Sequence, residues 1–467
     1  MTYVLAASFG DLTLTESIVF ISKSKMSSSN QIRSPFDYVP TELISNIFLC
    51  TLRLSSNFHE QHRFPISLLL TSHHWNSVAR CTPGLWTNIW LRRVGTLDHA
   101  GLRLRWSGNL PLTIEVDAGR IEEQMDLILP QVARWHSLSF TFLDVTAAHL
   151  GLPMLPPKAS RLEQLSITSG YHRQLGIAPF VPSIMDTPNL RCLCLHQANT
   201  NWLRWPLMYI EELSITDASL INLAQLADVL AESKQLQKLS LRGFSLKPMD
   251  QQDTELLKEA SLDALVELRL AGCRSSEVAG FLRLRMPKLQ KLRVAFENQI
   301  VFRNYWVHHR DEIEPLTNLK SISLHHIKSG PAFFDFLTRS APNVDYLAAS
   351  MDVLYNIQLS HFPKITTLTS VDCTPSIIRP FVESRKKTLQ TVNLNIDNMG
   401  IPGSSSKQAF IEIEEDLRYL YENVTMNRFG ITSASKGLQK YASWRAKEEG
   451  GRLTDAEANI QSEAAWS

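Results

Sequence analysis

Five basic residues lie in short leucine-rich phrases in the middle of the chain. They are Lys238, Arg242, Arg269, Lys291 and Arg293. An arginine side chain can bind a carboxylate or a phosphate through two parallel hydrogen bonds, and a lysine adds a point charge. Together on one surface, these residues could bind an acidic or phosphorylated segment of a protein substrate, with Glu267 neutralising part of their charge. The alternative is a solvated charged surface without a ligand.

Histidines and glycines form no pattern typical of an enzyme. The HEQH stretch at 59–62 lies in an expected loop and is one residue short of the HExxH spacing that brings two histidines to one zinc ion. The histidine pairs elsewhere are adjacent residues, whose side chains diverge on a helix or strand. The chain has no GxSxG, GxxxxGK[ST] or GxGxxG motif. We therefore expect a protein that is not an enzyme, with no catalytic residues, no metal and no cofactor.

Composition limits the classes of partner and compartment. A net charge of +1 over 467 residues gives no general attraction to nucleic acids or anionic membranes. The six cysteines include no CxxC pair, which is typical of reduced thiols inside the cell. No run of 18 apolar residues predicts a transmembrane helix. We expect a cytoplasmic or nuclear protein that binds neither nucleic acid nor membrane.

The elements that carry the basic residues belong to a repeat. A phrase of the type LxxLxL occurs eleven times, from WHSLSF at 135 to LQTVNL at 389, at spacings of 20 to 30 residues. This period is typical of leucine-rich repeats. Chance repetition in a chain that is 44% hydrophobic is the alternative, and the even spacing argues against it.

Each phrase predicts a strand whose last two apolar residues point into a core, while the residues between them face outward. One unit cannot bury its own apolar edge, so the units must stack. Helical patterns at 220–234 and 333–342 would return the chain outside the strands. These features predict a curved α/β solenoid, with the basic residues on its concave face. In leucine-rich repeats an asparagine or cysteine usually follows each strand. In this chain only Cys273 is clearly in that position.

The segment before the repeats predicts three short helices, at 40–52, 65–70 and 72–81, followed by a TPGLW turn. The first helix is apolar on more than one side, which is more than a helix with one solvated face requires. Its apolar residues are Leu43, Ile44, Ile47, Phe48, Leu49, Cys50 and Leu52. We expect one face to pack on Leu68, Leu69 and Trp75, and the second face to be covered either by the same chain or by a partner.

This segment resembles the F-box-like domains that are abundant in mushroom-forming fungi. The resemblance covers about residues 36–116: VPTELI at 39–44, TSHHWNSVA with Trp75, TPGLWTNIWL at 82–91 and LRLRWSGNLPLTIEV at 102–116. Val39, His73 and His74 depart from the family pattern, which has leucine or basic residues there.

The resemblance implies a substrate receptor of a Skp/cullin/F-box ubiquitin ligase. The helices would bind a Skp-type adaptor, and through it a cullin, and the repeats would bind the substrate. The adaptor-binding residues would be Pro40, Leu43, Ile44, Ile47, Phe48 and Trp75. A repeat scaffold without a ligase connection, or a helical cap that binds nothing, is the alternative.

These expectations divide the chain into five parts. Residues 1–33 form a disordered leader without the basic region of a signal peptide. Residues 34–95 form the F-box-like helical module, and 96–130 a connecting segment. Residues 131–400 form the irregular leucine-rich-repeat solenoid. Residues 401–467 form a C-terminal cap helix and a flexible tail.

Overall fold

A computed structural model gives the fold of the chain. It describes residues 39–55, 58–91, 97–142, 151, 154–169, 186–196, 207–216, 226, 230, 232–243, 261–273, 275–295, 315–325, 331–357, 360–371, 373, 375–395, 415–416, 419–420 and 423–430. The chain divides into two compact units, the first made of 1–171 with 182–189 and the second of 172–181 with 190–467. The predicted leader and the tail after residue 430 lie outside the described residues.

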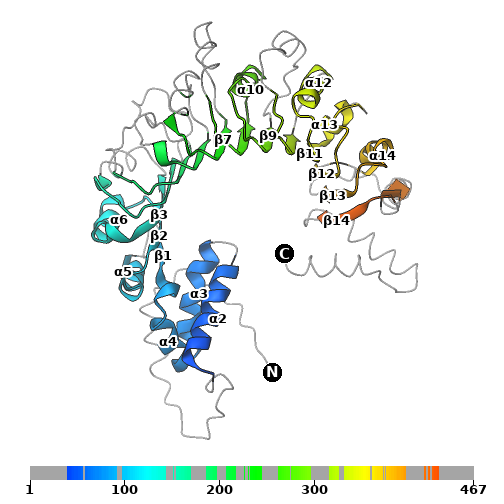
Figure 1. Ribbon diagram of the computed structural model, residues 1–467. Helices are drawn as coiled ribbons and strands as arrows, with labels where there is room; N and C mark the ends of the chain where they lie inside the picture. The colour runs from blue at the N-terminus through cyan, green and yellow to red at the C-terminus, as the bar shows by residue number, and fades with distance from the viewer. Residues whose placement is uncertain are drawn as a thin grey trace, which may run out of the picture. The chain divides into compact units, whose positions relative to one another are not determined.

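The first unit begins with a bundle of three helices (Figure 1). They are α2 (Thr41–Leu54), α3 (Phe58–Thr71) and α4 (His73–Arg80), followed by the short 3-10 helix η2 (Pro83–Trp86). Pro40 precedes α2, where a missing backbone N–H costs nothing. The prediction of a loop around HEQH is wrong, because α3 begins at Phe58 and includes this stretch. Pro65 is tolerated inside α3 although proline usually disfavours a helix interior.

A compact core holds the bundle together. Ile44, Phe48 and Leu52 of α2 are buried, since their spacing of four residues places them on one side of the helix. The Phe48 ring lies 5.1 Å from that of Trp75 and 6.3 Å from that of Phe64, measured between centroids. The core residues are Ile44, Phe48, Leu52, Leu68, Val78, Ala79, Leu85 and Trp86.

Four parallel strands follow the bundle in the first unit. They are β1 (Asn88–Leu91), β2 (Leu112–Asp117), β3 (Trp135–Phe142) and β4 (Gln164–Ser169), paired in chain order. Helix α5 (Leu97–Trp106) lies between β1 and β2, while α6 (Ile121–Ile128) and the 3-10 helix η3 (Leu129–Arg134) lie between β2 and β3. Strands therefore begin well before residue 131, where the repeats were expected to start.

Arg103 of α5 joins the bundle to the first strand. Its guanidinium donates hydrogen bonds to the backbone oxygens of Asn88 in β1 and His62 in α3, and lies 5.4 Å from the centre of the Trp86 ring. The Asn88 side chain donates to the Gln61 Oε1 atom at 3.0 Å. Burial lowers the pKa of Arg103 to about 10, which leaves it charged near neutral pH. The bundle and β1 are thus fixed to each other by part-buried hydrogen bonds.

The second unit is a ladder of parallel strands in chain order. The strands are β5 (Cys192–His196), β6 (Glu212–Thr216), β7 (Lys238–Arg242), β8 (Glu267–Ala271), β9 (Lys291–Ala295), β10 (Ser321–His325), β11 (Tyr346–Ser350), β12 (Thr367–Val371), β13 (Thr391–Asn395) and β14 (Thr425–Gly430). The register keeps equivalent leucines side by side, as in Leu239, Leu268 and Leu292. These rows build the core.

Helices cover one side of this ladder. They are α10 (Ser275–Leu282), α12 (Pro331–Ser340), α13 (Met351–Asn356) and α14 (Pro375–Ser384), which lie on a common side of the strands in Figure 1. We call the opposite side the strand face. The predicted fold, a small N-terminal helical module followed by a leucine-rich-repeat-like α/β solenoid, is confirmed by these strands and helices.

Polar side chains tie successive repeats together at two kinds of position. The amide groups of Asn189, Asn318 and Asn343 donate hydrogen bonds to backbone oxygens of the preceding repeat, at 2.6 to 2.9 Å. After the strands, the buried thiol of Cys373 approaches the backbone oxygen of Ala349 in the preceding repeat, whereas the buried thiol of Cys273 approaches that of Ala271 at the end of its own strand. Cys373 therefore occupies the position that sequence reasoning assigned to Cys273 alone.

Near its C-terminal end the ladder carries further structure. Strand β14 pairs with β13, which sequence reasoning did not predict. Residues 415–416 and 419–420 of the predicted cap helix are helical. Arg379 of α14 bonds Asp416 at 3.0 Å and lies over the Tyr419 ring, so this segment packs on the last helix of the ladder. None of the described helices is both long and apolar enough to cross a membrane.

Candidate functional site

The first candidate surface is an apolar stripe on the solvent side of α2. Leu43 and Ile47 are 54% and 53% exposed, and Leu54 is 85% exposed. Cys50 lies between them and is also exposed. The four residues follow each other at spacings of four, three and four, so they share one face of the helix. We call Leu43, Ile47, Cys50 and Leu54 the α2 stripe.

Two of the six predicted adaptor-binding residues lie elsewhere. Ile44 and Phe48 are only 2% and 3% exposed, because they belong to the core of the bundle. Their assignment to a partner surface is therefore corrected, since no partner can reach them without unfolding the bundle. The apolar residues of this helix therefore divide into a buried side, which packs in the bundle core, and the exposed α2 stripe. Sequence reasoning also missed Leu54, because it ended the helix at residue 52.

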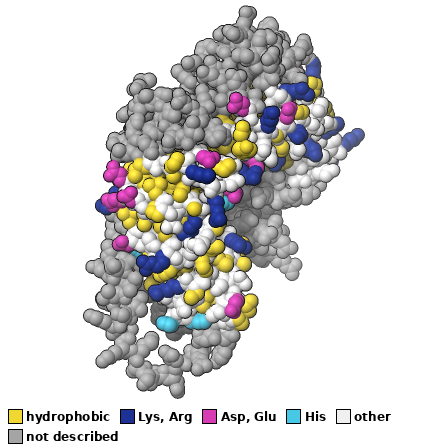
Figure 2. All heavy atoms as spheres, turned by 60° about the vertical axis from the view of Figure 1, so that its left-hand side comes forward, with side chains coloured by type: hydrophobic (Ala, Val, Ile, Leu, Met, Phe, Trp, Pro, Cys, Tyr) yellow, Lys and Arg dark blue, Asp and Glu magenta, His cyan; other side chains and the backbone are white. Residues whose placement is uncertain are grey.

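The other predicted adaptor-binding residues lie around α2. Pro40 is exposed before the first turn of the helix. Trp75 is half-buried and packs on Phe48, with its backbone N–H bonded to the Ser72 side chain that caps α4. Leu68 and Leu69 pack in the same cluster, so the predicted core side of α2 is confirmed. Figure 2 shows hydrophobic side chains at the surface of the helical bundle, beside charged and histidine side chains.

The second candidate surface is basic and lies on the strand face of β7, β8 and β9. All five predicted residues are exposed there: Lys238, Arg242, Arg269, Lys291 and Arg293. The register places Arg269 beside Arg293, and Glu267 beside both Lys238 and Lys291. Neighbouring strands are about 4.8 Å apart. The structure thus brings together the basic residues that the sequence predicted on one face.

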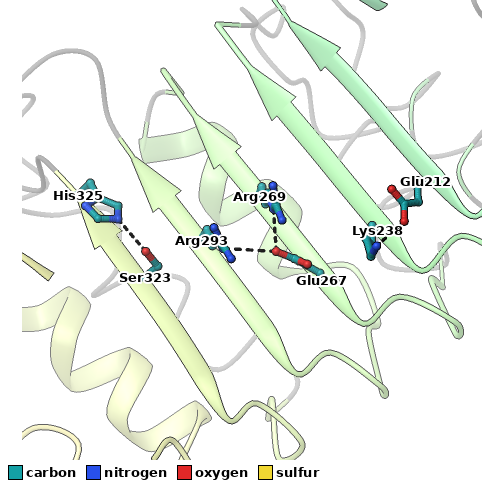
Figure 3. Close-up of polar contacts among 7 residues, drawn as sticks. All are labelled: Glu212, Lys238, Glu267, Arg269, Arg293, Ser323 and His325. Carbon is teal, nitrogen blue, oxygen red and sulfur yellow. Dashed lines mark hydrogen bonds and ion pairs between the residues drawn. The ribbon is translucent and has the colours of Figure 1, made fainter. Parts of the chain in front are cut away.

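One buried carboxylate organises the centre of this surface. Glu267 Oε1 lies 2.7 Å from Arg269 Nε and 3.3 Å from Arg293 Nε (Figure 3). Burial raises the pKa of Glu267, but the hydrogen bond from Arg269 and the charges of Arg269, Arg293 and Lys291 outweigh it. The net pKa therefore lies below the usual value. Glu267 is ionised near neutral pH, as the predicted partial neutralisation requires.

The basic surface ends at β6 on one side and at β10 on the other, where the side chains on the strand face are acidic or neutral. On β6, Glu212 accepts a hydrogen bond from Lys238, and this contact raises the pKa of the lysine. On β10, Ser323 and His325 bond each other at 2.7 Å. Figure 3 shows all of these side chains on the same face of the strands. Sequence reasoning did not identify Glu212 as a partner of Lys238, because only the register brings them together.

The thiols of β5 lie on the strand face. Cys192 and Cys194 are both free and partly exposed. Burial, followed by the charge of Glu212, raises the pKa of both thiols. They are therefore mostly protonated near neutral pH and poor nucleophiles. Within the described residues, no group of three or more histidine, cysteine or acidic side chains is placed to hold a metal ion.

Comparisons with known proteins were made for the whole chain. No family model and no curated protein matches it. Among solved structures, the crystal structure of the yeast Rad7 and Elc1 complex matches with a TM-score of 0.34 and 12% identity, covering 90% of this chain and 98% of that chain. A leucine-rich-repeat protein of Leptospira interrogans matches with a TM-score of 0.25 and 14% identity, covering 70% and 91%. Neither similarity carries an argument about function, and the fold assignment rests on the strands themselves.

Proposed function

We propose that this protein is the substrate receptor of a Skp/cullin/F-box-type ubiquitin ligase. The helical bundle binds a Skp-type adaptor, and the strand face of the ladder binds the substrate. The chain itself catalyses nothing. It acts by holding the substrate close to a ubiquitin carrier, which raises the effective concentration of the reacting groups.

The α2 stripe is the observation that supports this proposal. More than half of the surface of each of Leu43, Ile47 and Leu54 is exposed to solvent. The opposite side of the same helix already packs in the bundle core, so these residues are not needed for that core. Aligned apolar residues on one exposed helix face are typical of a protein interface. The sequence resemblance of residues 36–116 to F-box-like domains indicates the class of partner.

The attachment of the bundle to the first strand also supports a receptor. Arg103 bonds the backbone of α3 and of β1, so the helices are fixed to the strands of the first unit rather than tethered by a free linker. A rigid attachment would preserve the orientation of the bound adaptor relative to these strands.

Co-purification with a recombinant Skp-type adaptor tests the proposal. Changing Leu43→Asp and Ile47→Asp together should weaken adaptor binding by more than about a hundredfold, because burying each such side chain contributes about 1.5–3 kcal/mol. Isothermal titration would measure the affinity, and circular dichroism would check that the bundle is folded. Phe48→Asp is unsuitable, because it would disrupt the core.

The matched control changes two exposed apolar residues away from α2. Leu110→Asp with Met208→Asp adds the same charge, and both side chains are exposed. Adaptor affinity should stay within about twofold of the wild type, because surface changes away from an interface have small effects. A wild-type chain that does not bind the adaptor would leave a scaffold without a ligase connection as the better description.

A further inference from the structure

Two arginines on neighbouring strands are held in place by one carboxylate. Arg269 of β8 and Arg293 of β9 are register partners, and both contact Glu267 Oε1 through their Nε atoms. The side chain of Glu267 is 7% exposed, whereas those of the arginines are 47% and 52% exposed. No hydrogen bond joins the terminal nitrogens of either guanidinium to another described residue. Each arginine therefore keeps two donor groups for a ligand.

The residues around this pair leave room beside it. Along the strands, the next row contains Arg242, Ala271, Ala295 and His325 in register. The two alanines are partly exposed and carry only a methyl group. In the row of the arginines, Ser323 follows Arg293 on β10. Short side chains next to the guanidinium groups thus leave space for a ligand that both arginines can contact.

The charge of this part of the strand face favours an anion. Lys238 is paired with Glu212, which leaves Arg242, Arg269, Lys291 and Arg293 around the single carboxylate of Glu267. Within the described residues, β7, β8 and β9 present no other acidic side chain on this face. A positive charge therefore remains after the internal ion pairs are counted. A phosphomonoester, with a charge of about −1.5 to −2 and three acceptor oxygens, matches it.

We propose that Arg269 and Arg293, with Arg242 and Lys291 beside them, bind the phosphate of a phosphorylated serine or threonine in a substrate segment. This inference rests on the proposed function for the identity of the segment as substrate. Two planar forks can together engage three phosphate oxygens. A carboxylate has two oxygens and satisfies one fork, so glutamate should be a poor substitute.

The neighbouring strands favour a protein segment over a nucleic acid. The strand face of β10 to β13 carries hydroxyl and amide groups from Ser321, Tyr346, Thr369 and Asn393. Tyr346 and Asn393 both donate to the Thr369 hydroxyl, at 2.8 and 3.1 Å, which leaves the Thr369 proton and the Asn393 side-chain oxygen to bond a peptide backbone. Nucleic-acid binding instead needs a series of phosphate contacts, often with aromatic rings for stacking bases. The cations here occupy three strands, or about 10 Å across the ladder.

Retention of peptide libraries by the immobilised full-length chain tests the inference. Three degenerate libraries, with phosphoserine, serine or glutamate at the central position, would be applied and the retained fraction measured by mass spectrometry. The phosphoserine library should be retained at least about tenfold more than the other two, the difference expected from one additional bidentate contact. The oligonucleotide dT20 would be applied in the same way.

Two variants and a control identify the site. Arg269→Lys with Arg293→Lys keeps the charge but removes both forks, and should lower retention of the phosphoserine library about tenfold. Arg269→Glu with Arg293→Glu should abolish retention. Arg120→Glu with Lys158→Glu makes the same change in net charge at exposed residues of the first unit, and should leave retention unchanged.

Several results would overturn the inference. They are equal retention of the glutamate library, stronger retention of dT20, no retention of any library, or full retention by the double lysine variant. The experiment needs no adaptor, and the chain with Leu43→Asp and Ile47→Asp should retain the phosphoserine library like the wild type. A failure here is therefore distinguishable from a failure of adaptor binding.

Discussion

Glu267 has a structural role in addition to its effect on charge. A buried carboxylate requires partners, and this one obtains them from two neighbouring arginines, which it holds on the surface. A contact of this kind links the stability of the ladder to pH. The pKa of Glu267 is below the usual value of 4.5, so the folded state favours the ionised form.

Replacing Glu267→Gln should lower the free energy of unfolding by about 1 kcal/mol near neutral pH, a modest value because both arginines are half-exposed. The lowered pKa means that the stabilisation is fully present above pH 4.5 and is lost as pH falls through the folded-state pKa. Urea unfolding of both proteins, near pH 7 and at about pH 3, would measure this. A difference that grows on acidification would contradict the assignment.

Arg103 is a second residue whose role only the structure reveals. Its change to methionine would leave the backbone oxygens of His62 and Asn88 without this donor and remove a charge that packs on Trp86. We expect a local destabilisation of about 2–3 kcal/mol, the cost of leaving buried polar groups unpaired. Hydrogen exchange of α3 and β1 should become faster.

The control for this change is Arg105→Met in the same helix, at an exposed position. Exchange in α3 and β1 should stay as in the wild type, because no hydrogen bond or ion pair joins the Arg105 side chain to a described residue of either element. Equal acceleration in both variants would mean that Arg103 does not fix the bundle to the strand.

At the scale of elements, the sequence predicted the repeats better than their ends. Each of the eleven LxxLxL phrases forms a parallel strand, two in the first unit (β3 and β4) and nine in the ladder (β5 to β13), because its apolar spacing buries side chains on one side of the strand. Strands β1 and β2 were missed because they have no full phrase and follow the turn and helix of the bundle. Strand β14 was missed because TMNRFG has only isolated apolar residues.

The candidate surfaces show a similar division. Alternation along the strands predicted the five exposed basic residues correctly, since a period of two assigns each side chain to a face. The contact between Lys238 and Glu212 depends on the register of two strands far apart in sequence, which no local pattern contains. For α2, helical periodicity could not divide neighbouring apolar residues between core and surface, so Ile44 and Phe48 were misassigned.

Asparagines before the strands offer a test of how successive repeats are joined. The Asn343 side chain donates to the backbone oxygen of Thr317 at 2.9 Å and accepts a hydrogen bond from the exposed Lys364 at 2.9 Å, and Asn343→Ala should cost about 1 kcal/mol, mainly by removing the first of these bonds. Urea unfolding would measure the change. Asn356→Ala is the matched control, because its side chain bonds only the preceding turn of its own helix, and it should have a smaller effect. Equal effects would argue against a joining role for Asn343.

At the scale of the whole molecule, the two candidate surfaces lie in different compact units. The α2 stripe belongs to the first unit and the basic strand face to the second. The overall net charge of +1 does not reveal the basic surface, because acidic residues elsewhere in the chain balance its charge. A receptor needs two such surfaces, one for the ligase and one for the substrate. Changes to one surface should therefore leave binding at the other unaffected.

The exposed thiol of Cys50 allows the central claim to be measured directly, because this residue lies within the α2 stripe. The rate of maleimide modification would be followed by mass spectrometry with and without a saturating Skp-type adaptor. Cys192 on the strand face of the second unit, whose raised pKa makes it react more slowly, serves as the internal reference through the ratio of its own rates with and without adaptor. We predict that the adaptor slows modification of Cys50 at least about tenfold, as expected when bound protein excludes solvent from a buried interface, and leaves Cys192 unchanged. Modification of Cys50 at the same rate in the presence of the adaptor would contradict the proposed docking surface.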